Sequence, residues 1–192
     1  MYLCKIFQKP DFDMKTVQLL DKKFVLSISE KEIRNAINAI AKQINTDLKG
    51  KNPLFVGILN GSFMFAADLM KRVTITSEIT FIKVASYTDT QSTGIVKELL
   101  GLECDVKNRP IVIVEDIVDS GLTMKKIIEQ LRAKGAEEIY VSTLLLKPDA
   151  LRFKVPLDYV AIRIPNEFIV GYGLDYNGYG RNLRNIYTLV QK

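Results

Sequence analysis

The chain contains no histidine and no tryptophan, and only two cysteines among its 192 residues. Cys4 and Cys104 are too few for a disulfide framework, and without histidine or closely spaced cysteines they do not complete a zinc site. We interpret both as unreactive free thiols in a reducing compartment. The absence of histidine also means that any proton transfer would rest on another group, and a carboxylate is the natural carrier.

Long apolar runs and clustered basic runs are absent as well. No apolar stretch approaches the roughly 18 residues that a membrane span needs, and the chain does not open with a basic-then-apolar signal segment. The net charge of +5, with a pI of about 9.1, is not concentrated in one segment. These features predict a cytoplasmic protein without a membrane or nucleic-acid partner. The mild positive charge would attract phosphorylated small molecules as readily as nucleic acid, but without a basic cluster we interpret it as a contribution to solubility.

The residues that are present suit one compact domain spanning 1–192, because 47% of them are hydrophobic. Ser29 followed by Glu32 forms a capping-box pattern, and apolar residues then recur at helical spacing until Gly50. A second helix is expected from Gly61 toward Met70. A third helix is predicted by the apolar positions Met124, Ile127, Ile128 and Leu131 and ends before Gly135.

Apolar and β-branched runs predict five strands between these helices. They are Leu54–Leu59, Val73–Ala85, Ile111–Val114, Ile139–Leu146 and Tyr159–Ile164. Strands that alternate with helices predict an α/β fold with a mostly parallel, doubly wound sheet flanked by helices, and such folds bind ligands beyond the carboxyl ends of the strands. The polar stretch from Ser86 to Gly94 is predicted to form a mobile lid.

The stretch most informative about chemistry runs from Ile111 to Thr123 (IVIVEDIVDSGLT). A buried-strand pattern is followed by Glu115, Asp116 and Asp119, carboxylates that a cation or a polyhydroxylated ligand would compensate. A loop of small residues then opens a helix, where free backbone N–H groups favour a phosphate. Together these residues could hold a sugar phosphate. The alternative is a solvated strand-to-helix turn with ordinary capping residues, and the spacing of a Walker A loop is missing.

The run from Val114 to Thr123 resembles the phosphoribosyl diphosphate motif of type I phosphoribosyltransferases. Three further stretches are similar to the hypoxanthine-guanine branch of that family: Leu144–Pro148 (LLLKP), Ile164–Tyr176 (IPNEFIVGYGLDY) and Arg181. The matches extend in order from about Glu30 to Thr188. The resemblance implies a phosphoribosyltransferase fold with a small hood region built from the chain termini, and a homodimer or homotetramer. It also implies transfer of the phosphoribosyl group to hypoxanthine, and to guanine, giving IMP (GMP) and pyrophosphate.

The resemblance implies a role for each matching residue. Glu115 and Asp116 would face the ribose hydroxyls directly or through Mg²⁺, Asp175 would hold a second Mg²⁺, and Asp119 would be the general base or acid at purine N7. The loop from Asp119 to Thr123 would cradle the 5′-phosphate. The complete set for phosphoribosyl diphosphate is Glu115, Asp116, Asp119, Ser120, Gly121, Leu122, Thr123, Asn60, Gly61 and Arg181.

On the purine side, the resemblance implies that Lys147 donates to O6, that Phe168 stacks on the ring, and that the Ile169 backbone meets the purine edge. Ser86 and Tyr87 would begin a flexible loop that closes over the site. Without the resemblance, Phe168 would be interpreted as a core aromatic and Lys147 as a surface lysine in a turn. Arg181 would be a solvated charge and Asp175 a turn residue.

Two positions depart from the family pattern. In the family, a basic residue is common before the glycine, at a non-proline cis peptide whose N–H binds pyrophosphate, but here Asn60 stands before Gly61. Asn166 stands where aspartate is frequent.

A regulator that senses phosphoribosyl diphosphate and binds nucleic acid is a second hypothesis, but residues 1–30 show neither a helix-turn-helix pattern nor a charge cluster. Transfer to xanthine, adenine or a pyrimidine is a third, and Lys147 argues against adenine because adenine carries an amino group at C6. The sequence does not rank hypoxanthine, guanine and xanthine.

Overall fold

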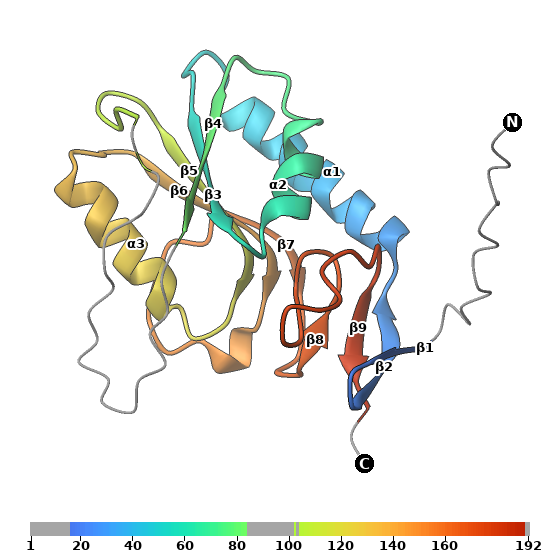
Figure 1. Cartoon of the computed structure of the whole chain (residues 1–192). Coiled ribbons are helices and arrows are strands. Elements are labelled where there is room, and N and C mark those ends of the chain that lie inside the picture. Colours follow the sequence, from blue (N-terminus) through green and yellow to red (C-terminus); the bar gives the residue numbers. More distant parts are fainter. Residues whose placement is uncertain (1–15, 84–101, 103, 191–192) are drawn as a thin grey trace, which may run out of the picture.

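The computed structural model describes residues 16–83, 102 and 104–190, which form two sheets with helices packed on the larger one (Figure 1). Cys4, Ser86, Tyr87 and the predicted lid from Ser86 to Gly94 therefore lie outside the described residues. No helix among the described residues is long and apolar enough to cross a membrane.

The larger sheet has five strands, and every pair of neighbours in it is parallel. In the order in which they lie side by side, the strands are β4 (Glu78–Lys83), β3 (Leu54–Leu59), β5 (Ile111–Val118), β6 (Ile139–Leu146) and β7 (Tyr159–Arg163). The central strands are apolar along most of their length because helices cover both faces, as in other parallel sheets. This arrangement confirms the predicted α/β class.

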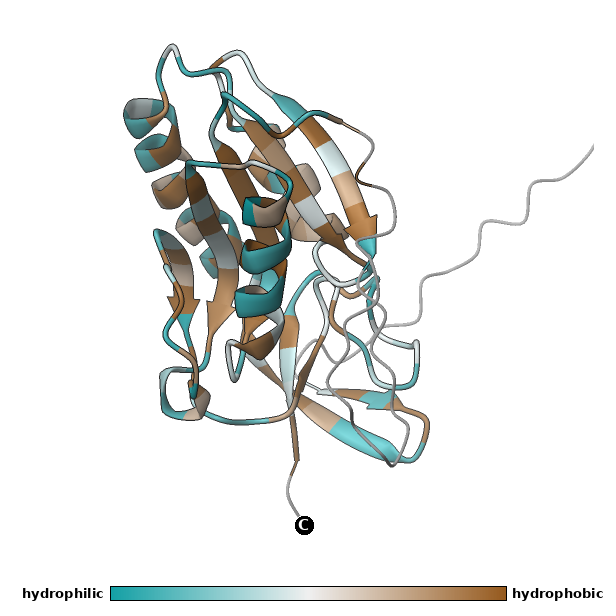
Figure 2. Ribbon diagram, turned by 90° about the vertical axis from the view of Figure 1, so that its left-hand side faces the viewer, coloured by the Kyte–Doolittle hydropathy of each residue, from teal (hydrophilic) through white to brown (hydrophobic). Residues whose placement is uncertain are grey.

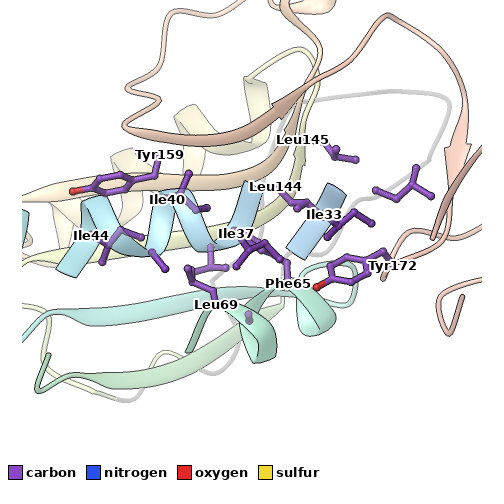
Figure 3. Packing of buried hydrophobic residues seen from close by; sticks show 14 of the residues in the cluster. Ile33, Ile37, Ile40, Ile44, Phe65, Leu69, Leu144, Leu145, Tyr159 and Tyr172 are labelled. Atoms are coloured by element: carbon purple, nitrogen blue, oxygen red, sulfur yellow. The ribbon is translucent and has the colours of Figure 1, made fainter. Parts of the chain in front are cut away.

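The helices divide between the two faces of this sheet. Helices α1 (Glu30–Asp47) and α2 (Phe63–Met70) pack on one face with Phe55 and Val112, and α3 (Leu122–Ala133) packs on the other face with their neighbours in the strands. Figure 2 shows the hydrophobic strands enclosed between the helices. The isoleucines that recur along α1 lie in the core beside α2 and β6 (Figure 3). The predicted capping box at Ser29 and Glu32 is present.

The smaller sheet, which we call the hood, is antiparallel and comes from both ends of the described chain. Its strands, in spatial order, are β1 (Thr16–Leu19), β2 (Lys22–Ile28), β9 (Ile186–Leu189) and β8 (Ile169–Val170). Its own core is small and consists of four buried residues: Val17, Phe24, Val170 and Tyr187. A short 3-10 helix, η1 (Pro148–Ala150), follows β6.

Three predicted strand boundaries were wrong. The strand predicted from Val73 begins only at Glu78, because Val73 and Ile75 pack against the core beneath α1 and α2 instead of pairing with β3. The strand predicted to end at Val114 continues to Val118, since β5 keeps its pairing with β6 through the acidic residues. Strand β7 ends at Arg163, one residue before the predicted end.

Candidate active site

The paired acids of β5 lie inside the strand rather than beyond its end. Glu115 is opposite Thr143 of β6 and only 8% exposed, whereas Asp116 is half-buried and accepts a hydrogen bond from the Ile117 N–H (2.9 Å). Burial, and after it the negative charge of Asp116, raises the pKa of Glu115 well above its ordinary value of 4.5. Two acids kept so close in a buried strand favour a ligand that brings positive charge or hydroxyl donors.

The loop after β5 has the shape of an anion cradle. Gly121 adopts φ +82°, and a Cβ there would lie 2.9 Å from the Phe153 carbonyl oxygen, so glycine is required for this close approach. The Ser120 carbonyl accepts from the Arg152 and Phe153 N–H groups (3.0 and 3.1 Å), which fixes the loop before α3. A pocket of about 90 Å³ is lined by Glu115, Ile117, Val118, Asp119, Ser120, Gly121, Thr123 and Met124. Its position at a helix start suits a phosphate.

Lys147 is a buried lysine beside Asp119, which lines this pocket. It follows β6, its side chain is 10% exposed, and its Nζ lies 3.4 Å from Oδ2 of Asp119. The Lys147 N–H donates to the Val118 carbonyl (3.0 Å), which ties the end of β6 to the end of β5. The interpretation of Lys147 as a solvated surface lysine is therefore wrong. A buried ammonium beside an exposed carboxylate is an arrangement that can present both a donor and a proton acceptor to a ligand.

Two glycines bring the loop after β3 against the acids. A Cβ on Gly61 would lie 1.6 Å from Oδ2 of Asp116, and a Cβ on Gly173 would lie 2.0 Å from the Gly61 carbonyl oxygen. The backbone at Gly61 is therefore in direct contact with both β5 and the loop around Gly173. The cis peptide bond joins Leu59 to Asn60, one bond earlier than the Asn60–Gly61 bond that the family pattern suggested.

Asp175 and Arg181 form an ion pair on the same side of the molecule. Arg181 Nη2 lies 2.6 Å from Asp175 Oδ1, and Arg181 Nη1 donates to the Gly173 carbonyl (2.6 Å). The other carboxylate oxygen of Asp175 accepts from the Gly178 N–H (2.6 Å). Through Gly173 and Gly61, this pair is connected to Asp116. The alternative interpretation of Arg181 as a solvated charge is therefore wrong, whereas Asp175 is a turn residue, as the alternative has it, that also pairs with Arg181.

The acids were also predicted to hold Mg²⁺. Among residues 16–83, 102 and 104–190, no three acidic or cysteine side chains form a cluster that could hold a metal by themselves. Asp175 is paired with Arg181 and does not join Glu115 and Asp116. The oxygen donors nevertheless fit Mg²⁺, which is commonly held by one or two carboxylates and completes its shell with substrate oxygens and water.

Phe168 precedes β8 and is 46% exposed, so it is not the core aromatic that an apolar run suggests. Its ring packs on Phe24 and Tyr176, with ring centres 6.2 and 6.0 Å away. The next residue, Ile169, is buried and pairs with Thr188 of β9. An exposed ring that packs against other aromatic rings provides a stacking surface for a flat ligand.

Comparison with known proteins identifies the family of the chain. The model of the phosphoribosyl transferase domain matches residues 27–177, and the chain therefore belongs to this family. Within the family, the chain is 41% identical over 165 residues to the hypoxanthine-guanine phosphoribosyltransferase of Streptococcus pyogenes serotype M3, which covers 85% of this chain and 92% of that protein.

Two further similarities concern a solved structure and a longer relative. A crystal structure of hypoxanthine phosphoribosyltransferase from Staphylococcus aureus superimposes with a TM-score of 0.79 at 39% identity, and covers 86% of this chain and 90% of that chain. The bifunctional protein TilS/HprT of Listeria monocytogenes is 40% identical over 157 residues, which are 81% of this chain but only 24% of that protein. The chain thus spans about a quarter of this longer relative.

Sequence reasoning missed several residues of the site. Gly173 was not singled out, and its close contact with Gly61 is visible only in the fold. Lys22 and Tyr176, which contact Phe168, were not singled out, nor was Asp21, which accepts from the Tyr176 hydroxyl. The motif near Phe168 already contained Tyr176, but no local pattern in the N-terminal segment indicates that the turn between β1 and β2 reaches this ring.

Proposed function

We propose that this chain joins hypoxanthine, and also guanine, to phosphoribosyl diphosphate and thereby forms IMP (GMP) and pyrophosphate. The observation that carries this proposal is the buried Lys147 beside Asp119 at the mouth of the phosphate loop. Lys147 supplies an ammonium for a 6-oxo group, and the adjoining pocket offers a carboxylate for a purine proton and backbone donors for a sugar phosphate.

The phosphoribosyl half of the substrate is assigned to the residues around β5. The loop from Asp119 to Thr123, including Leu122 at the start of α3, receives the 5′-phosphate on its N–H groups, and Asp116 with Glu115 positions the ribose hydroxyls. Asn60 and Gly61 contribute backbone groups to the pyrophosphate. Arg181 supplies a fixed positive charge to the pyrophosphate after exchanging Asp175 for it.

The purine half is assigned to the hood and to the end of β6. Phe168 stacks on the ring, the Ile169 backbone meets its edge, and Lys147 donates to O6. A purine nitrogen then attacks C1 of the ribose, the bond from C1 to the pyrophosphate oxygen breaks, and the configuration at C1 is inverted. Asp119 accepts or returns the proton at N7, so that the purine nitrogen that attacks carries an available electron pair.

Glu115 and Asp116 would hold one Mg²⁺ and Asp175 a second, each together with oxygens of phosphoribosyl diphosphate. When bound, the metal neutralises the diphosphate and makes it a better leaving group.

We also propose that the enzyme is cytoplasmic and forms a homodimer or homotetramer. The exposed apolar side chains of Ile79 and Phe81 on the outer strand β4 support an assembly, because a second subunit would cover them.

The test of the function is to incubate the protein with phosphoribosyl diphosphate, Mg²⁺ and each nucleobase separately, and to identify the nucleotide by mass. We expect IMP and GMP and no AMP, since adenine offers a donor where Lys147 needs an acceptor. Binding of phosphoribosyl diphosphate without nucleotide formation from any base would contradict the proposal and favour a non-catalytic sensor. Nucleotide formation from xanthine would widen the substrate range without changing the reaction.

Removal of the metal tests the role of the acids separately. With excess chelator, turnover should fall to background, because three carboxylates otherwise face a polyanionic substrate. Addition of Mg²⁺ beyond the chelator should restore the rate. Full turnover in chelator would remove the metal from this proposal while leaving the substrate assignment intact.

A further inference from the structure

The turn between β1 and β2 packs directly on the aromatic side chains of the purine side. Lys22 Nζ lies over two rings, 4.4 Å from the centre of Tyr176 and 5.6 Å from the centre of Phe168. Both distances are within the range in which an ammonium is attracted to an aromatic face. Tyr176 meets Phe168 edge to face, with an interplanar angle of 88° and ring centres 6.0 Å apart.

Tyr176 is itself held in place from several sides. Its hydroxyl donates to Oδ1 of Asp21 (2.9 Å), and this hydrogen bond is the main reason that the pKa of Asp21 is lowered. Its backbone N–H and carbonyl are paired with those of Tyr179 (2.9 and 3.0 Å), which closes a tight turn. Phe24, fully buried in the hood core, lies below both rings, with centres 6.3 Å from Tyr176 and 6.2 Å from Phe168.

Phe168 needs such support because the residue is 46% exposed. A ring at the surface can change rotamer, and fixing it when the purine arrives would reduce affinity by the entropy lost. The contacts with Lys22 and Tyr176 restrict the ring before binding. The cation also draws on the electron density of the ring, which favours stacking of an electron-rich purine.

We propose that Lys22 and Tyr176, with Asp21, are positioning residues that hold the Phe168 ring in the orientation that stacks on the purine. The proposal rests on the proposed function. It assigns to the β1–β2 turn, far from the phosphate loop in sequence, a role in purine affinity alone. The turn carries no group that touches the ribose or the pyrophosphate in this assignment.

The experiment compares steady-state constants of Lys22→Met with those of Lys23→Met. Methionine keeps the length and the apolar stem but removes the charge. Lys23 is the exposed neighbour on β2, and its backbone pairs with Gln18 and Val190. For Lys22→Met we expect KM for hypoxanthine to rise about two- to fivefold, while kcat and KM for phosphoribosyl diphosphate stay within about twofold. Lys23→Met should match the wild type, and Lys22→Arg should restore the purine KM.

Tyr176→Leu and Tyr176→Phe extend the test to the second ring. Leucine removes the edge-to-face contact and should raise the purine KM by more than Lys22→Met does, whereas phenylalanine removes only the bond to Asp21 and should have a smaller effect. An unchanged purine KM in both Lys22→Met and Tyr176→Leu would overturn the positioning role. So would a parallel rise in KM for both substrates, because that indicates general loosening. A wild-type protein that forms no nucleotide would instead refute the proposed function.

Discussion

The parallel sheet and the hood contribute different kinds of side chain to the site. The sheet provides carboxylates and an ammonium on strands and at strand ends that are buried on both faces, as Glu115 and Lys147 show. The hood provides an exposed aromatic ring on a sheet whose own core has only four buried residues. Charged groups that must act on one bond gain from a rigid support, because small displacements are costly there. A stacking surface tolerates more movement.

This comparison predicts that changes in the sheet alter the rate of reaction, and that changes in the hood alter the affinity for purine. Lys147 is the strictest test of this separation between rate and affinity. It lies at the end of a strand of the parallel sheet but is assigned to the purine. The following predictions test the division from the largest expected effect to the smallest.

Asp119→Asn should have the largest effect, and it changes only the part of the site that the parallel sheet contributes. Asparagine keeps the shape of the side chain but removes the proton acceptor, and general acid–base groups contribute about 10²–10⁴-fold to rate. We expect the single-turnover rate to fall by this factor while affinity for phosphoribosyl diphosphate stays within a few-fold. Rapid-quench measurement at saturating substrates gives the first quantity, and equilibrium binding gives the second.

A matched control for this variant is Asp149→Asn. Asp149 is an exposed aspartate in η1, just after Lys147 in the sequence. It should react at the wild-type rate. An unchanged single-turnover rate in Asp119→Asn would exclude Asp119 as the base. A loss of phosphoribosyl diphosphate affinity equal to the loss of rate would mean that Asp119 organises the phosphate or the metal instead.

Lys147→Ala tests the boundary between the two regions. A charge-assisted hydrogen bond in a dry site is worth about 1.5–3 kcal/mol, so purine affinity should fall roughly ten- to a hundredfold. Affinity for phosphoribosyl diphosphate should change little. Isothermal titration with each substrate separates the two outcomes. If the variant keeps its purine affinity and loses phosphoribosyl diphosphate, Lys147 belongs to the phosphate site and the division must be redrawn.

The same two regions differ in how far the sequence predicts them. The strands of the parallel sheet are continuous apolar runs, and Leu54–Leu59 and Ile139–Leu146 were predicted with the observed bounds, because burial on both faces leaves a strong local signal. For the hood, the resemblance implied a region built from the chain termini, but the individual strands were not predicted. They are short and half-exposed, and β2 pairs with β9, which lies about 160 residues later in the chain, so that neither strand has a local signal strong enough to identify it.

The site shows a similar limit. The motif from Val114 to Thr123 indicated the phosphate loop because strand, acids and small residues follow one another in sequence. Chemistry that depends on distant segments was not accessible: the contact of Gly173 with Gly61, the Asp175–Arg181 pair and the burial of Lys147 arise only when the strands are side by side. The placement of Glu115 within the strand was also missed, because an acid is read as the end of an apolar run unless its partner strand is known.

Glu115→Gln is expected to have the smallest effect, which is a change in the thermal stability of the protein without metal or substrate. Burial and the charge of Asp116 raise the pKa of Glu115 well above 4.5, so the folded protein binds a proton at this site more tightly than the unfolded chain does. The corresponding stability is therefore fully present below about pH 4.5 and is lost as the pH rises through the raised pKa. Glutamine is neutral at every pH and does not undergo this loss.

In chelator, Glu115→Gln should accordingly unfold at a higher temperature than the wild type at pH 7–8. We expect a difference of a few degrees, which is the shift that about 1 kcal/mol produces in a domain of this length. The difference between the two should shrink as the pH falls toward 4.5. Thermal unfolding in chelator across this range gives the comparison, with Glu129→Gln on the exposed face of α3 as the control without a pH-dependent difference of this size. A lower unfolding temperature for Glu115→Gln at neutral pH would show that the carboxylate stabilises β5 through its contacts. The sheet would then hold this acid for its own stability, and the assignment of Glu115 to the ribose and metal would lose its physical basis.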